Sequence, residues 1–141
     1  MPDAGAAVVY WDASAILSVL ISDAHSTRAT TVARTTARHL LSTLAYAEVT
    51  AVIGRMERER HLPTVLAQAA RELLRDGPWR RLVLQPDWTS IDAMAMRWPL
   101  RGADLWHLAA AATLSRELPE VRLLSFDGRL AAAAEGLGLG M

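Results

Sequence analysis

Residues 8–14 read VVYWDAS, and they set a pattern that the rest of the chain repeats. The first four are β-branched or aromatic, which is typical of a short buried strand. Asp12 ends that strand, and residues 13–21 have the pattern of a helix. A carboxylate between a strand and the next helix stands where open α/β sheets bind ligands. Taken alone, Asp12 or Ser14 is an equally good N-terminal cap of the helix.

The composition favours one globular domain in a reducing compartment. The chain has 141 residues, 52% of them hydrophobic, and no cysteine. This length fits a single domain, and the lack of cysteine excludes disulfides and thiolate sites. Residues 1–7 lack the segments of a signal peptide, and no apolar run reaches the roughly 18 residues of a membrane helix. We therefore expect a cytoplasmic protein without membrane contact.

The charge pattern excludes a globally basic nucleic-acid surface. The formal net charge is zero, so any contact with RNA or DNA must use local patches. All 15 basic residues are arginine. Arginine binds phosphate bidentately, although genome composition is the simpler explanation of a uniform arginine bias.

Three further stretches have strand patterns, and the segments between them have helical ones. We expect strands at residues 38–42, 80–85 and 121–126, and a candidate edge strand at 137–141. We expect helices at residues 13–21, 24–36, 44–60, 62–75, 90–98, 103–118 and 129–135. Strands that alternate with helices indicate right-handed crossovers and a mostly parallel sheet covered on both faces. The predicted fold is α/β, a three-layer α/β/α sandwich formed by a single domain over residues 1–141.

Two of these helices have informative apolar patterns. Residues 103–118 are almost entirely apolar, which predicts a helix buried on all sides. In the helix at 62–75, the predicted apolar face consists of Val65, Leu66, Ala69 and Leu73.

Glu48 interrupts the apolar stripe of the helix at 44–60. Leu44 and Val52 lie one helical turn away on either side. Glutamate is almost never buried without a partner, so a functional role is attractive. The alternative is that the stripe reaches the rim of the protein there, or that an arginine pairs with Glu48.

Two more acids stand at helix starts. Asp104 lies in the first turn of the buried helix, where the helix dipole alone would favour a carboxylate. Asp127 ends the last predicted strand as Asp12 ends the first, although Asp-Gly is also a common turn pair. In a parallel sheet these positions lie at one edge, so the four carboxylates are expected to converge.

Converging carboxylates predict a divalent cation. Like charges repel and raise one another's pKa, and a bound cation removes that penalty. Mg²⁺ and Mn²⁺ prefer oxygen ligands, and such a site suits metal-assisted hydrolysis of phosphodiesters.

The four acids and their neighbours resemble those of PIN-domain ribonucleases, and most closely the VapC-type toxins of bacterial toxin–antitoxin pairs. The matching motifs are YWDASA at residues 10–15, LAYAEV at 44–49, GADLWHLA at 102–109 and LSFD at 124–127. Their order and spacing agree over essentially the whole chain. One departure is that many relatives carry a further acid just after the fourth, where this chain has Gly128-Arg129-Leu130. The number of bound metals therefore stays open.

The resemblance implies an endoribonuclease that cleaves tRNA or rRNA with a Mg²⁺ or Mn²⁺ cofactor and water as the nucleophile. It implies Asp12, Glu48, Asp104 and Asp127 as catalytic residues, with Asp12, Asp104 and Asp127 as metal ligands. It also implies a cognate antitoxin as partner, and a homodimer or a hetero-oligomer with that antitoxin.

Three other residues are candidates for supporting roles. Ser14 corresponds to a hydroxyl residue often found beside the first acid of the family. His107 shares a helix face with Asp104, and its alternatives are a metal ligand, a substrate contact or a hydrogen-bonded structural residue. Arg101, in the loop before Asp104, is a candidate phosphate contact. We assign Ser125 no role beyond a supporting contact.

The sequence thus predicts a metal-dependent endoribonuclease toxin and leaves two alternatives. Carboxylate–metal chemistry does not itself select the sugar, so a structure-specific DNA nuclease is one alternative. The other is a PIN-like module that has lost catalysis and only binds a partner.

Overall fold

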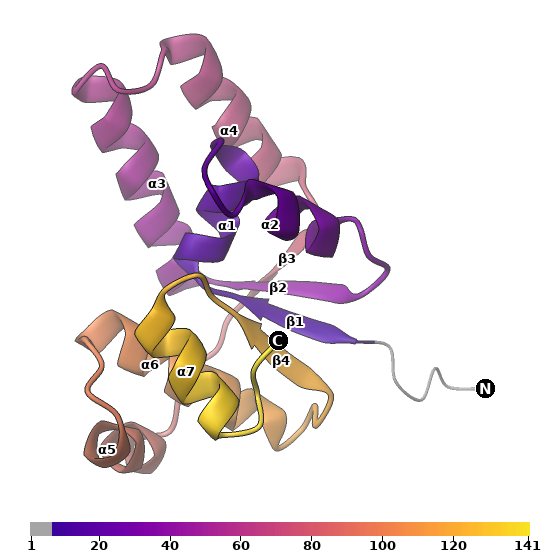
Figure 1. Cartoon of the computed structure of the whole chain (residues 1–141), viewed down its shortest axis with the longest axis vertical. Coiled ribbons are helices and arrows are strands. Elements are labelled where there is room, and N and C mark those ends of the chain that lie inside the picture. The colour runs from indigo at the N-terminus through magenta and orange to yellow at the C-terminus, as the bar shows by residue number, and fades with distance from the viewer. Residues whose placement is uncertain (1–6) are drawn as a thin grey trace.

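The structure, a computed structural model, describes residues 7–141. Its elements follow the predicted alternation of strands and helices (Figure 1). The strands are β1 (Val8–Trp11), β2 (Arg38–Ser42), β3 (Trp79–Leu82) and β4 (Val121–Leu124). The helices are α1 (Ala13–Leu20), α2 (Ser26–Ala33), α3 (Thr43–Arg58), α4 (Thr64–Asp76), α5 (Trp88–Arg97), α6 (Gly102–Ser115) and α7 (Gly128–Gly136).

The four strands form one parallel sheet in the order β3-β2-β1-β4. β1 is central, with Trp11 opposite Leu41 of β2 and Leu124 of β4. Because all strands run in the same direction, their carboxyl ends lie at one edge of the sheet. Chain segments more than a hundred residues apart therefore meet there.

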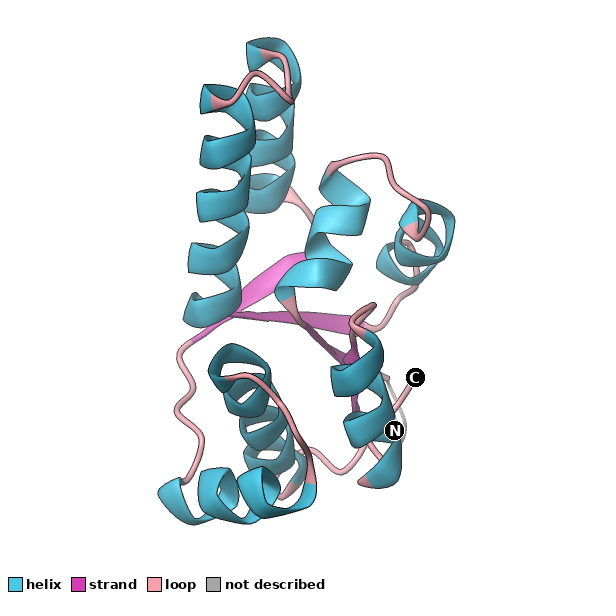
Figure 2. Ribbon diagram, turned by 60° about the vertical axis from the view of Figure 1, so that its left-hand side comes forward, coloured by secondary structure: helices cyan, strands magenta, loops and turns pink. Residues whose placement is uncertain are grey.

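Helices cover both faces of the sheet, which confirms the predicted three-layer α/β/α class (Figure 2). Successive strand residues point to opposite faces. Val9 and Trp11 pack with the layer formed by α1 to α4, whereas Val8 and Tyr10 pack with the layer formed mainly by α6 and α7. α6 is buried over most of its length, as its apolar composition predicts.

The apolar face predicted for α4 was wrong. The buried residues are Ala67, Ala70 and Leu74, whereas Val65, Leu66 and Leu73 are exposed. The two alanines allow close packing, and α4 contacts α3 and α1. The larger aliphatic side chains are thereby left on the outer side of the helix.

β3 and β4 end earlier than predicted, because the strand that each pairs with ends there. β3 is an edge strand paired only with β2, and it ends at Leu82 opposite Ser42, so Val83 beyond it is 93% exposed. β4 ends at Leu124, two residues earlier than predicted, because its partner β1 ends at Trp11.

The candidate edge strand at 137–141 is absent from the structure. A single bridge joins Leu123 to Gly140 there, with a hydrogen bond from Leu123 N to Leu139 O.

No helix among residues 7–141 combines the length and the hydropathy of a membrane-spanning segment. The expectation that residues 1–7 hold no signal peptide concerns positions that lie, apart from Ala7, outside the described residues.

Candidate active site

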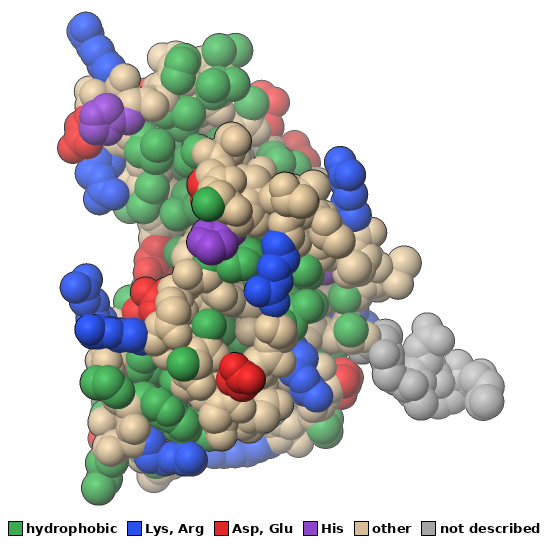
Figure 3. Space-filling view, in the orientation of Figure 1, with side chains coloured by type: hydrophobic (Ala, Val, Ile, Leu, Met, Phe, Trp, Pro, Cys, Tyr) green, Lys and Arg blue, Asp and Glu red, His purple; other side chains and the backbone are tan. Residues whose placement is uncertain are grey.

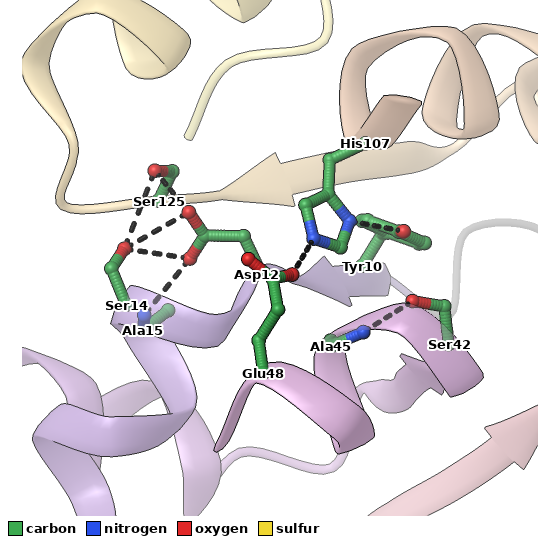
Figure 4. Close-up of polar contacts among 9 residues, drawn as sticks. All are labelled: Tyr10, Asp12, Ser14, Ala15, Ser42, Ala45, Glu48, His107 and Ser125. Atoms are coloured by element: carbon green, nitrogen blue, oxygen red, sulfur yellow. Dashed lines mark hydrogen bonds and ion pairs between the residues drawn. The ribbon is translucent and has the colours of Figure 1, made fainter. Parts of the chain in front are cut away.

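Asp12 directly follows β1 and is almost completely buried. It caps α1, since Oδ1 accepts a hydrogen bond from Ala15 N at 2.9 Å. It also accepts hydrogen bonds from two hydroxyls, from Ser14 Oγ to Oδ1 at 2.7 Å and from Ser125 Oγ to Oδ2 at 2.5 Å (Figure 4). Burial raises the pKa of Asp12 above its usual value, and these hydrogen bonds partly oppose the rise. From the sequence, capping of α1 and a place in the active site were alternative roles for Asp12. In the structure the same carboxylate caps α1 and lies at the carboxyl end of the sheet.

The two serines tie the end of β4 to the start of α1. Ser14 Oγ accepts a hydrogen bond from Phe126 N at 3.0 Å, and Ser125 Oγ accepts one from Asp127 N, also at 3.0 Å. Ser125 was undervalued from sequence because we placed it inside a strand. Since β4 ends at Leu124, Ser125 lies just beyond the strand, and its hydroxyl reaches Asp12.

Asp127 lies three residues beyond the end of β4 and caps α7. Its Oδ1 accepts hydrogen bonds from Arg129 N at 3.0 Å and Leu130 N at 3.1 Å. Asp104 lies in the first turn of α6 and is half-buried. Like Asp12, both acids therefore lie at the start of a helix and at the candidate site.

Asp104 and Asp127 line one hollow of about 460 Å³ between the starts of α6 and α7. Two arginines, Arg101 and Arg129, line the same hollow, and within residues 7–141 neither forms an ion pair. On the face drawn in Figure 3, acidic and arginine side chains lie next to each other at the waist of the molecule. Arg101 is exposed, which suits the predicted phosphate contact, and Arg129 is a second such candidate that we missed in the sequence.

The four acids are close enough to affect one another electrostatically. Burial raises the pKa of Asp104, and the negative charges of Asp127, Asp12 and Glu48 raise it further, with His107 in partial opposition. The structure therefore brings together acids from four distant parts of the chain, as their positions in the sequence predict.

Glu48 leaves α3 toward the same edge, and its side chain is 31% exposed. Its partner is His107, whose Nε2 lies 2.7 Å from Glu48 Oε1. The other ring nitrogen, Nδ1, lies 2.7 Å from Tyr10 Oη. The sequence did not reveal Tyr10, because an aromatic residue in a buried strand is expected to be part of the core.

The donor chemistry of the site fits a hard cation surrounded by water. Among residues 7–141, no three His, Cys, Asp or Glu side chains are arranged to hold a metal ion by themselves. Mg²⁺ does not require such a cage, because it commonly binds one or two carboxylates, several waters and a substrate phosphate. The negative charges that raise the pKa of Asp104 impose the kind of penalty that such a cation would relieve.

Comparisons with known proteins add one structural relative. No protein-family model and no curated protein matched the sequence. Among solved structures, the fold is similar to that of VapC20 from Mycobacterium tuberculosis, a toxin that cleaves the sarcin–ricin loop. The TM-score is 0.60 at 16% identity, and the match covers 89% of this chain and 94% of the other.

The fold is PIN-like. A match that spans nearly the whole of both chains agrees with the PIN-domain resemblance of the sequence motifs. At 16% identity the likeness establishes the shared fold, and the activity has to be argued from the site.

Proposed function

We propose that this protein is a metal-dependent endoribonuclease, the toxin of a toxin–antitoxin pair, acting in the cytoplasm. The observation that carries the proposal is geometric: Asp12 lies at the carboxyl ends of β1 and β4, Asp104 and Asp127 line one hollow, and Glu48 contacts α6 through His107. The PIN-like fold, shared with an RNA-cleaving toxin, supports the same reading. By the same resemblance we propose a cognate antitoxin as partner, and a homodimer or a toxin–antitoxin hetero-oligomer.

Each residue has a definite task in this proposal. Asp12, Asp104 and Asp127 would hold Mg²⁺ or Mn²⁺ together with waters and the substrate phosphate, and the bound cation would make water a better nucleophile and stabilise charge on the phosphoryl oxygens. Ser14 and Ser125 keep the Asp12 carboxylate in one orientation. Glu48 orients the attacking water.

Arg101, joined by Arg129, binds substrate phosphates beside the acids. The two arginines line the same hollow as Asp104 and Asp127, so a phosphate held by either lies close to the acidic cluster. Arginine suits this task because its planar guanidinium binds phosphate through two parallel hydrogen bonds.

The test is cleavage of total RNA, tRNA and intact ribosomes by the purified protein with Mg²⁺ or Mn²⁺. Ribosomes are included because the structural relative cleaves the sarcin–ricin loop. We expect Asp12→Asn and Asp104→Asn to lower the cleavage rate by about two orders of magnitude or more, since each removes a carboxylate proposed to hold the cation. Asp92→Asn is the matched control, because Asp92 is an exposed acid on α5.

Other outcomes would contradict the proposal in distinguishable ways. Cleavage that survives both substitutions, or that resists EDTA, would exclude this site as the catalytic centre. Preferential cleavage of DNA offered at equal concentration would instead identify a DNA nuclease. Absence of cleavage together with absence of Mn²⁺ binding by calorimetry would identify a module that only binds a partner.

A further inference from the structure

Tyr10 and His107 form a buried polar contact in the apolar layer between β1 and α6. Both side chains are essentially inaccessible to solvent. Both ring nitrogens of His107 have partners, Tyr10 Oη at Nδ1 and Glu48 Oε1 at Nε2, each at 2.7 Å (Figure 4). A line of three side chains therefore runs from the centre of the sheet to a catalytic carboxylate.

The hydrogen-bond partners assign the position of each proton. An ionised carboxylate only accepts hydrogen bonds, so His107 Nε2 carries the proton that is donated to Glu48. The Tyr10 hydroxyl carries a proton that it can donate, and His107 Nδ1 lies 2.7 Å from its oxygen. Tyr10 O–H is then the donor to Nδ1, an arrangement that holds a proton of His107 on Nε2.

The imidazole is also held in place by its neighbours. The rings of Tyr10 and Trp106 meet it edge-on, with centroids at 5.7 Å and 5.6 Å and interplanar angles of 62° and 90°. A ring with this packing and two short hydrogen bonds has a fixed direction for its Nε2–H bond. The direction of that bond in turn fixes the position of Glu48 Oε1.

Glu48 needs an external restraint of this kind. It is half-exposed and extends from α3, which packs in the layer opposite α6, so its contact with His107 crosses the carboxyl edge of the sheet. Within residues 7–141, Glu48 Oε2 takes part in no hydrogen bond. One oxygen is thus held and the other is left for the reaction.

We propose that Tyr10 and His107 are positioning residues, which hold the Glu48 carboxylate in its reactive orientation through the chain Tyr10 O–H to His107 Nδ1 and His107 Nε2–H to Glu48 Oε1. This inference rests on the proposed function for the reaction that Glu48 serves. It goes beyond that function because it assigns a task to a buried strand residue and selects one role for His107. Neither residue touches the substrate in this scheme.

Tyr10→Phe is the mild test, because it removes one oxygen and keeps the ring. We expect the variant to fold with an unfolding temperature near that of the wild type. Its kcat for RNA should fall about 10- to 100-fold, the usual cost of losing an orienting partner, with KM unchanged. His107→Gln, which removes the ring itself, should lower kcat at least as much. A folded Tyr10→Phe protein whose kcat stays within twofold of wild type would overturn the proposal.

His39 supplies a matched control. It is as deeply buried as His107, and its Nδ1 also accepts a hydrogen bond from an aromatic side chain of β1, from Trp11 Nε1 at 3.1 Å. Its Nε2 faces a backbone carbonyl, Thr35 O at 3.2 Å, instead of a catalytic acid. His39→Gln should therefore lower the unfolding temperature and leave kcat of the folded fraction unchanged. Equal losses of kcat in His39→Gln and His107→Gln would indicate a purely structural role and refute the proposal.

A second readout does not depend on activity. Long-range ¹H–¹⁵N NMR of the wild-type imidazoles should show His107 protonated at Nε2 and bare at Nδ1. A proton on Nδ1, or a bare Nε2, would rule out the relay even in an active enzyme. Conversely, an inactive wild-type protein with the expected tautomer would contradict the proposed function alone.

Discussion

Asp104 experiences more negative charge than an exposed acid at a helix start normally would. Asp127, Asp12 and Glu48 all act on it, and burial adds to their effect. The ionised Asp104 carboxylate is therefore expected to lower the stability of the metal-free protein, and the proposed cation would relieve this effect. The cost should be measurable without any assay of catalysis.

Asp104→Asn should become increasingly stabilising relative to wild type as pH rises. The folded-state pKa of Asp104 is raised above its ordinary value of 3.8, so the folded chain binds more protons than the unfolded chain in this window. The wild-type free energy of unfolding therefore falls as pH rises through 3.8 toward the raised pKa, and the substitution removes that fall. Urea unfolding in EDTA and low salt, between pH 4 and pH 7, measures the difference.

Asp92→Asn, outside the cluster, is the control for this series. Saturating Mn²⁺ should raise the unfolding temperature of wild type more than that of Asp104→Asn, because a ligand bound only to the folded state stabilises it. A stability difference between Asp104→Asn and wild type that stays constant over this pH range would count against repulsion at Asp104.

α4 shows how an apolar pattern can indicate the wrong side of a helix. Leu74 is 2% exposed and Leu66 is 53% exposed, although both are leucines of the same helix. The exposed side chains Leu66 and Leu73 line a hollow of about 360 Å³ together with Leu20, Ile21 and Leu62. Periodicity finds apolar residues, but only the close packing of Ala67 and Ala70 determines which side faces the core.

A pair of substitutions on α4 tests this orientation. Leu74→Ala should lower the free energy of unfolding by about 2–5 kcal/mol, the range for leucines truncated inside cores. Leu66→Ala should lower it by less than about 1 kcal/mol, because most of that side chain is already in water. Chemical denaturation followed by circular dichroism gives both values. A larger loss in Leu66→Ala than in Leu74→Ala would mean that α4 buries the side we first predicted.

Strand ends were predictable only where a polar residue ends a short hydrophobic run. β1 and β2 lie at the predicted positions, because their hydrophobic runs are short and are bounded by Asp12 and Ser42. β3 and β4 end earlier than their apolar runs because the neighbouring strand has no further residues to pair with. Register is a property of the assembled sheet, so Ser125 could not be recognised as a partner of Asp12 from its own neighbourhood.

The formal net charge of the molecule is zero, so the proposed recognition of RNA must use local patches. Arg101 and Arg129 lie beside the acids at the hollow between α6 and α7, where a phosphate backbone would cross the sheet edge. Three of the acids could be found from sequence because each stands at a strand end or helix start, and Glu48 could be found because it interrupts an apolar helix stripe. The arginine pair and the Tyr10 contact could not, because they depend on how these elements are placed in space.

Arg101→Ala and Arg129→Ala should each weaken RNA binding and reduce its dependence on salt. Each lost phosphate contact to single-stranded RNA should lower the slope of log K against log salt by about 0.7. Fluorescence anisotropy on the inactive Asp12→Asn background, in a series of salt concentrations, measures this slope. Arg34→Ala is the matched control, because Arg34 is exposed and follows α2 at the opposite edge of the sheet. Identical slopes in all variants would exclude the arginine pair as a binding surface.

The order of the strands also determines when the proposed site can form during translation. β4 pairs with β1, and Ser125 follows Asp12 by 113 positions. The first strand therefore has its β4 partner only after the last strand has been synthesised. Until residues 121–127 have left the ribosome, Asp12 has no Ser125 hydroxyl, and Asp127 is missing from the edge. Because synthesis proceeds from the amino terminus, the proposed active site would be complete only when the polypeptide is nearly finished.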